Sequence, residues 1–154
     1  MARLFVVRHA DAGTRKHGGA NDELRPLSDR GLRQAQGIAE ALAEKGITRL
    51  VSSPYLRCVQ TLEPLGKALG VKVEIDERLS EGMGFVGALE LADELRTAPA
   101  ALCSHGDVIP DVLEALLRRG TKFEDDLRWQ KASTWVLKRD GEEFSKARYL
   151  PPPA

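Results

Sequence analysis

Short apolar runs alternate with helical patterns along most of the chain, and this alternation constrains the fold more than any other feature. Leu4–Val7 is a continuous apolar run with two β-branched residues, which predicts a strand buried on both faces. Similar runs predict strands over 47–52, 71–75 and 100–104. The alternation is typical of an α/β three-layer sandwich, a mostly parallel central sheet with helices on both faces.

Helical spacing of apolar residues predicts helices between these strands. A helix is expected over 29–45, capped by Ser28 and ended before Gly46. A second helix is expected over 56–69, with a kink or break at Pro64. The remaining predicted elements are helices over 88–95 and 112–119 and hairpin strands over 134–137 and 144–150, joined by an Asp140-Gly141 turn.

Length and charge narrow the class of protein. A chain of 154 residues with 42% apolar side chains can bury one well-developed core. We therefore expect a single domain over 1–150 and an extended, exposed Pro-rich tail over 151–154. The 23 basic and 23 acidic side chains are scattered and cancel to a net charge of zero. This balance disfavours a nonspecific nucleic-acid binder and a protein held on an anionic membrane.

The chain also lacks patterns for export and for a metal centre. Its first residues contain an apolar run of only four, too short for a signal peptide or membrane span, so we expect a cytoplasmic protein. Cys58 and Cys103 have no Cys-x-x-Cys partner and are expected to be buried, reduced thiols. His9 and Asp11 alone complete no metal site, so we expect no metal and no other cofactor.

Chemically capable side chains follow the carboxyl ends of three predicted strands. Arg8 and His9 follow the first, Ser52 ends the second shortly before Arg57, and His105 follows the fourth. Because ligands of parallel sheets bind beyond the carboxyl ends of the strands, we expect these residues to converge. The arginine forks match phosphate oxygens, and the helix start after Ser52 offers unpaired backbone N–H groups. The predicted ligand is a phosphate dianion.

Four segments resemble the histidine phosphatase superfamily. They are Leu4–Ala10, Pro26–Gly31, Ser52–Thr61 and Ser104–Asp107. The short length and the Arg-His-Ala sequence at 8–10 are most similar to the compact phosphohistidine phosphatases of the SixA type. Residues 103–111 and 131–137 also resemble the phosphatase domain that is fused to Nudix hydrolases in actinobacteria. Ala10 stands where the commonest pattern of the superfamily has glycine.

The resemblance implies a metal-independent phosphatase that works through a phosphohistidine at His9. In this mechanism a neutral ring nitrogen attacks phosphorus while the other ring nitrogen donates to a backbone carbonyl. The equatorial phosphate oxygens would be held by Arg8, Arg57 and a protonated His105. Ser52 is the expected hydroxyl contact.

The resemblance also suggests where the proton donor lies. Glu81 belongs to a Leu-x-Glu segment similar to the one that supplies the acid in many members. Asp107, two residues after His105, is the alternative acid. Mutases of the superfamily carry longer insertions for a lid, and the segment 76–99 leaves little material for one. Hydrolysis is therefore expected rather than mutase activity.

An open pocket suits a bulky substrate, so the expected substrate is phosphohistidine or another phosphorylated protein side chain. The alternatives are a phosphatase of nucleotides or other small phosphomonoesters, and a catalytically idle phosphate-binding module. The long connection over 10–27 is expected to be a solvated basic loop that includes His17. In the alternative, Arg15 or Lys16 grips the substrate.

Overall fold

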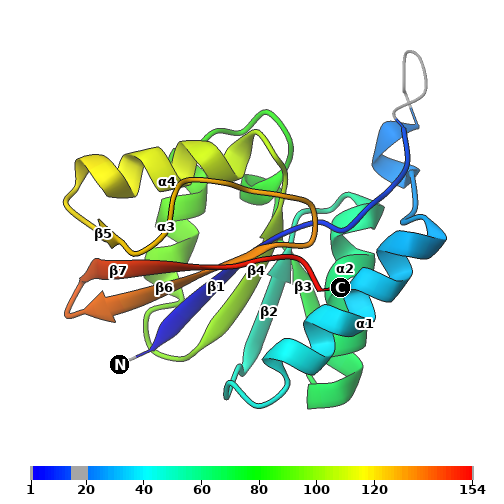
Figure 1. The fold of residues 1–154 in the computed structure, drawn as a ribbon, viewed down its shortest axis with the longest axis horizontal. Coiled ribbons are helices and arrows are strands. Elements are labelled where there is room, and N and C mark those ends of the chain that lie inside the picture. The colour runs from blue at the N-terminus through cyan, green and yellow to red at the C-terminus, as the bar shows by residue number, and fades with distance from the viewer. Residues whose placement is uncertain (1, 15–20, 154) are drawn as a thin grey trace.

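The computed structural model describes residues 2–14 and 21–153. Its strands are β1 (Arg3–Arg8), β2 (Arg49–Ser52), β3 (Val73–Ile75), β4 (Ala100–Ser104), β5 (Lys122–Phe123), β6 (Thr134–Asp140) and β7 (Glu143–Leu150). Its helices are α1 (Asp29–Leu42), α2 (Leu56–Leu69), α3 (Val86–Glu94) and α4 (Val108–Arg118), with the short 3-10 helices η1 (Asp22–Leu24) and η2 (Glu77–Leu79). Helices α1 and α2 lie on one side of the sheet and α3 and α4 on the other (Figure 1). The predicted α/β architecture is confirmed.

The sheet has the strand order β3-β2-β4-β1-β6-β7-β5. The first four strands in this order are parallel, whereas β6 is antiparallel to both β1 and β7. Arg8 at the end of β1 is level with Ser104, and Ser52 at the end of β2 is level with Cys103. The carboxyl ends of β1, β2 and β4 therefore form one edge, from which the candidate site residues emerge.

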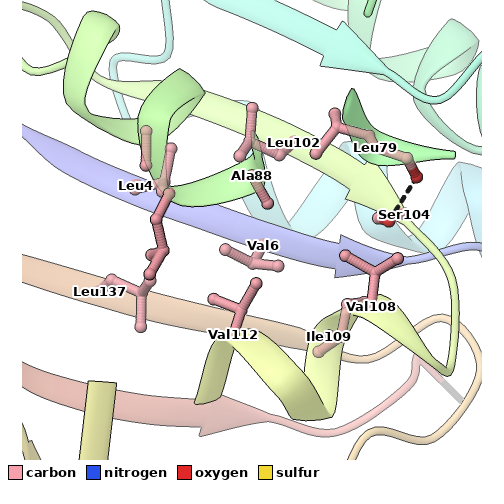
Figure 2. A pocket seen from close by; sticks show the side chains of 12 residues that line it. Leu4, Val6, Leu79, Ala88, Leu102, Ser104, Val108, Ile109, Val112 and Leu137 are labelled. Atoms are coloured by element: carbon pink, nitrogen blue, oxygen red, sulfur yellow. Dashed lines mark hydrogen bonds between the residues drawn. The ribbon is translucent and has the colours of Figure 1, made fainter. Parts of the chain in front are cut away.

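Apolar side chains fill both spaces between the sheet and the helices. Figure 2 shows the side covered by α3 and α4, where Leu4 and Val6 of β1 line a cavity together with Val108 and Val112 of α4. The cavity left among these side chains has a volume of only about 10 Å³, about the minimum that admits one water molecule. Close packing on this side fixes the positions of β1 and β4, which carry the candidate site.

The predicted helix boundaries are confirmed in part. Ser28 caps α1 by accepting a hydrogen bond from the N–H of Gly31 at 3.0 Å. Helix α2 continues through Pro64, so the predicted possibility of a break is wrong. Helix α4 begins at Val108 rather than at 112. Pro110 does not prevent this earlier start, because it lies in the first turn, where the backbone N–H has no intrahelical acceptor.

The carboxyl-terminal residues form the predicted hairpin and then turn toward α1. Gly141 has a φ of 70° in the turn between β6 and β7. Pro151 is exposed, but Pro152 and Pro153 are half-buried. A Cβ placed on Gly37 of α1 would lie 2.4 Å from the Cβ of Pro153. The prediction of an exposed tail is therefore wrong for its last two prolines, which lie against α1.

The described helices are all too short or too polar for a bilayer crossing.

Candidate active site

His9 follows β1 and is 6% exposed. Its Nδ1 lies 2.8 Å from the carbonyl oxygen of Ala10. A carbonyl only accepts hydrogen bonds, so Nδ1 carries the hydrogen and Nε2 carries the lone pair. Burial lowers the pKa of His9 to about 3; the carbonyl of Ala10 opposes this shift, and the charges of His105, Arg57 and Arg8 add to it. His9 is therefore neutral near pH 7.

The backbone next to His9 is tied to helix α2. The N–H of Ala10 donates to Oγ1 of Thr61 at 2.9 Å, and that hydroxyl donates to the carbonyl of Arg57 at 2.7 Å. The neighbouring Gln60 accepts from the N–H of Leu27 at 2.8 Å. The Gln-Thr pair thus connects α2 to both ends of the 10–27 connection.

Arg8 lies against the backbone of the turn that follows His105. Its Nη1 donates to the carbonyl of Trp129 at 2.8 Å. A Cβ placed on Gly106 would lie 2.6 Å from Nη2 of Arg8, so only glycine leaves room for this guanidinium. Burial lowers the pKa of Arg8, and the Asp107 carboxylate opposes that shift.

Arg57 lies in the first turn of α2 and is 1% exposed. Both of its terminal nitrogens contact Asp22 of η1: Nη1 donates to the carbonyl at 3.0 Å and Nη2 to the carboxylate at 3.2 Å. The Glu81 carboxylate lies 3.8 Å from Nη2, and the Tyr55 ring centroid lies 4.9 Å from the guanidinium carbon. No spacing rule connects Asp22 to Arg57, so sequence patterns do not predict this contact.

His105 follows β4 and is 1% exposed. Its Nε2 lies 2.8 Å from Oγ of Ser53 and 3.6 Å from Sγ of Cys58. Its ring centroid lies 5.5 Å from that of His9 and 4.6 Å from that of Tyr55, with both pairs edge to face. The two imidazoles therefore belong to one cluster.

Ser52 and Ser53 differ in what their hydroxyls contact. Ser52 is fully buried, and its hydroxyl donates to the carbonyl of Ser53 at 2.8 Å. The hydroxyl that reaches His105 belongs to Ser53. Ser52 is the predicted hydroxyl contact, but Ser53 makes the contact with His105, because strand alternation does not show how the chain turns at this strand end.

Three buried nitrogens of the cluster have no hydrogen-bond partner among the described residues: Arg8 Nε, Arg57 Nε and His105 Nδ1. Buried polar atoms are nearly always paired, and leaving one unpaired costs about 1–3 kcal/mol. The arginine nitrogens are donors, and Nδ1 is a donor when it carries a hydrogen. Such a set fits an anion with several acceptor oxygens, such as a phosphoryl group.

The two candidate acids lie at the rim of this cluster. Glu81 is 30% exposed and close to Arg57. Asp107 is exposed, and its Oδ2 accepts a hydrogen bond from the N–H of Gly82 at 2.7 Å.

The turn that carries Glu81 is also held from the other side of His105. Ser104 donates to the carbonyl of Leu79 at 2.7 Å (Figure 2). Residues on both sides of His105 therefore hold the turn that carries Glu81.

Comparison with known proteins identifies the family. The family model of the histidine phosphatase superfamily (branch 1) matches residues 4–90 of the chain. The chain belongs to this superfamily.

One relative of the chain is the 8-oxo-(d)GTP phosphatase of Mycolicibacterium smegmatis. The two are 33% identical over 155 aligned residues, which cover 97% of the chain and 48% of the relative. The chain thus spans about half the length of this relative.

Two solved structures show the same fold. The protein histidine phosphatase SixA with tungstate has a TM-score of 0.73 and 22% identity, covering 99% of this chain and 96% of SixA. A mycobacterial glucosyl-3-phosphoglycerate phosphatase with VO3 has a TM-score of 0.74 and 21% identity over the full length of both chains. The predicted resemblance to the superfamily is confirmed, and the resemblance to SixA is confirmed for the fold.

Cys58 and Cys103 are buried and not joined in a disulfide, as predicted, and burial raises the pKa of Cys103 well above its ordinary value. Arg15, Lys16 and His17 lie outside the described residues. Within 2–14 and 21–153, no three His, Cys, Asp or Glu side chains are grouped as metal ligands.

Proposed function

We propose that the chain is a phosphatase that transfers a phosphoryl group first to Nε2 of His9 and then to water, without a metal. The observation that carries the proposal is the set of three unpaired buried nitrogens on Arg8, Arg57 and His105. They supply donors for the oxygens of a phosphoryl group, beside a neutral imidazole that has a lone pair. Donors fixed before the reaction stabilise the charge that spreads over these oxygens in the transition state.

The chemistry takes two displacement steps. In the first, the Nε2 lone pair of His9 forms a bond to phosphorus, the bond to the leaving group breaks, and Glu81 gives its proton to the leaving atom. In the second, the Glu81 carboxylate takes a proton from water as the water oxygen attacks phosphorus, which releases inorganic phosphate and restores His9. The contact of Glu81 with Arg57 supports this assignment; Asp107 is the alternative acid, and its bond to Gly82 supports a holding role.

For the substrate we propose phosphohistidine or another phosphorylated protein side chain. The segment between Asp76 and Pro99 consists of η2, a turn and α3, and so holds no long insertion that could close over the site. A second candidate is a nucleotide or another small phosphomonoester. It is supported by the 33% identity to an 8-oxo-(d)GTP phosphatase across 97% of this chain.

The reaction is tested with an aryl phosphate in the presence of a chelator, together with trapping of acid-labile phosphate on the protein. We expect turnover that the chelator does not reduce, phosphate on His9, and loss of both in His9→Gln. Turnover abolished by the chelator, or kept by His9→Gln, contradicts the mechanism. Phosphate binding without turnover on any substrate indicates the idle module instead.

The substrate class is tested by comparing kcat/KM for a histidine-phosphorylated carrier protein with kcat/KM for oxidised and ordinary guanine nucleotides. A higher value for the carrier supports the first candidate. A higher value for the nucleotides supports the second and contradicts the first, and leaves the chemistry at His9 unaffected.

A further inference from the structure

We infer that Ser53 is a positioning residue that holds neutral His105 with its hydrogen on Nδ1; this rests on the proposed function, in which Nδ1 donates to the phosphoryl group. Oγ of Ser53 lies 2.8 Å from Nε2 of His105. Both residues are at most 1% exposed. At this distance a hydroxyl and a ring nitrogen form a hydrogen bond, in which either partner can be the donor.

The surroundings of Ser53 decide the direction of this bond. Its Oγ also accepts from the N–H of Tyr55 at 3.3 Å, which occupies one of its two lone pairs. Among the described residues, the one acceptor shown within reach of the hydroxyl hydrogen is Nε2 of His105. If Nε2 of the neutral ring carried the hydrogen, the buried hydroxyl of Ser53 would lose this acceptor, at a cost of about 1–3 kcal/mol. Ser53 therefore donates, and the ring hydrogen lies on Nδ1.

The tautomer of His105 affects the binding of a phosphoryl group. Nδ1 of His105 is buried and unpaired, so the tautomer determines whether it offers a hydrogen or a lone pair. A lone pair at this position repels a phosphoryl oxygen, whereas an N–H binds it. If the ring takes up a second proton, Nε2 donates to Ser53 and Nδ1 keeps its hydrogen. Ser53 thus supports phosphate binding in both charge states of His105.

The other neighbours of His105 are weaker candidates for this role. The His9 and Tyr55 rings meet His105 edge to face. Cys58 approaches Nε2, with its sulfur at 3.6 Å, but a thiol is a weaker donor than a hydroxyl. Cys58→Ala therefore provides a direct comparison with Ser53→Ala.

The first test reads the tautomer of His105 in the whole protein. The chain has three histidines, so long-range proton–nitrogen NMR spectra can be assigned with His9→Gln and His17→Gln. At a pH where the His105 ring is neutral, we expect its hydrogen on Nδ1 in the unmodified protein. A neutral His105 with its hydrogen on Nε2 overturns the inference, and this result needs no variant of Ser53 to fold.

The second test measures the dissociation constant of inorganic phosphate. Ser53→Ala is expected to raise it about tenfold and to move the His105 hydrogen toward Nε2, whereas Ser53→Thr keeps the hydroxyl and stays near the original values. Thr121→Val is the matched control: Thr121 is buried, and its hydroxyl donates to the carbonyl of Phe144 at 2.8 Å beside β5. This control is expected to lose stability without a change at His105.

Two outcomes would show that Ser53 does not fix the tautomer of His105. If Ser53→Ala leaves both the tautomer and the phosphate constant unchanged, the inference is wrong. A shift in Cys58→Ala that is absent in Ser53→Ala also overturns it and gives the role to Cys58.

Trapping of phosphate on His9 tests the proposed function separately. If no phosphohistidine forms but Ser53→Ala changes the His105 tautomer and the phosphate constant, the proposed reaction fails and the positioning role of Ser53 stands.

Discussion

Asp22 contacts both terminal nitrogens of Arg57, through its carbonyl at 3.0 Å and its carboxylate at 3.2 Å. The same carboxylate lies 3.2 Å from Nε of Arg25, and Nη1 of Arg25 donates to the carbonyl of Ala12 at 2.6 Å. The 21–25 segment is therefore joined both to Arg57 and to the chain just after His9. Asp22 fixes the guanidinium and also offsets part of its charge.

Asp22→Asn is expected to tighten the binding of inorganic phosphate. The amide keeps an acceptor for Arg57 but removes a negative charge close to the anion, so the inhibition constant should fall about three- to tenfold at low salt. The measurement is competitive inhibition by phosphate. Glu23→Gln is the matched control, because it removes an exposed charge of the same helix η1. Weaker inhibition in Asp22→Asn would contradict the charge argument and leave orientation as the main role of Asp22.

The low pKa of His9 predicts a pH dependence of stability. Burial lowers this pKa from 6.5 to about 3, so below pH 6.5 the unfolded chain binds a proton at His9 that the folded chain does not. The contribution of His9 to stability is complete above pH 6.5 and is lost as the pH falls toward 3, at up to about 1.4 kcal/mol per pH unit. In urea unfolding, His9→Asn should therefore gain stability relative to the unmodified protein by about 2 kcal/mol between pH 8 and pH 5. Parallel stability curves for the two proteins would contradict the buried, neutral state of His9.

Gly106→Ala should displace Arg8. The added Cβ would lie 2.6 Å from Nη2 and 2.7 Å from Cζ of Arg8, so the guanidinium must move away from the proposed phosphoryl site. We expect kcat/KM for an aryl phosphate to fall by about 10-fold or more, since charge-assisted contacts are worth about 1.5–3 kcal/mol. Gly87→Ala is the control, because its Cβ meets the aliphatic part of Arg78 at 3.0 Å. If both variants keep full activity, the tight fit between Gly106 and Arg8 does not matter for catalysis.

Glu81→Gln and Asp107→Asn distinguish the two acids. A general acid matters most when the leaving group is a poor one, so loss of the acid should lower kcat about 100-fold for an alkyl phosphate and much less for nitrophenyl phosphate. We expect this dependence on the leaving group in Glu81→Gln. Asp107→Asn keeps an oxygen for Gly82 and should lower kcat similarly for both substrates. The reverse pattern assigns the proton to Asp107.

Sequence patterns predict the parts of this protein that depend on periodicity and local chemistry. The apolar runs locate the central strands, and Ser28 predicts the start of α1. Contacts between distant segments follow no such rule: Asp22 reaches Arg57 from a connection with no periodic pattern. The distinction between Ser52 and Ser53 depends on how the chain turns at the end of β2, which sequence alternation does not describe. At Pro64 a local rule predicts too much: the helix α2 continues through this proline, because the packing of the helix outweighs one unfavourable residue.

Thr61 accepts a hydrogen bond from the residue that follows His9 and donates one to the carbonyl of Arg57. A single hydroxyl therefore connects the backbone next to His9, the proposed nucleophile, to the helical turn that carries Arg57. We expect a shift of α2 relative to the sheet to move these two groups together, which would conserve the separation between the His9 ring and Arg57. The proposed catalytic geometry would then tolerate small movements of the helices against the sheet.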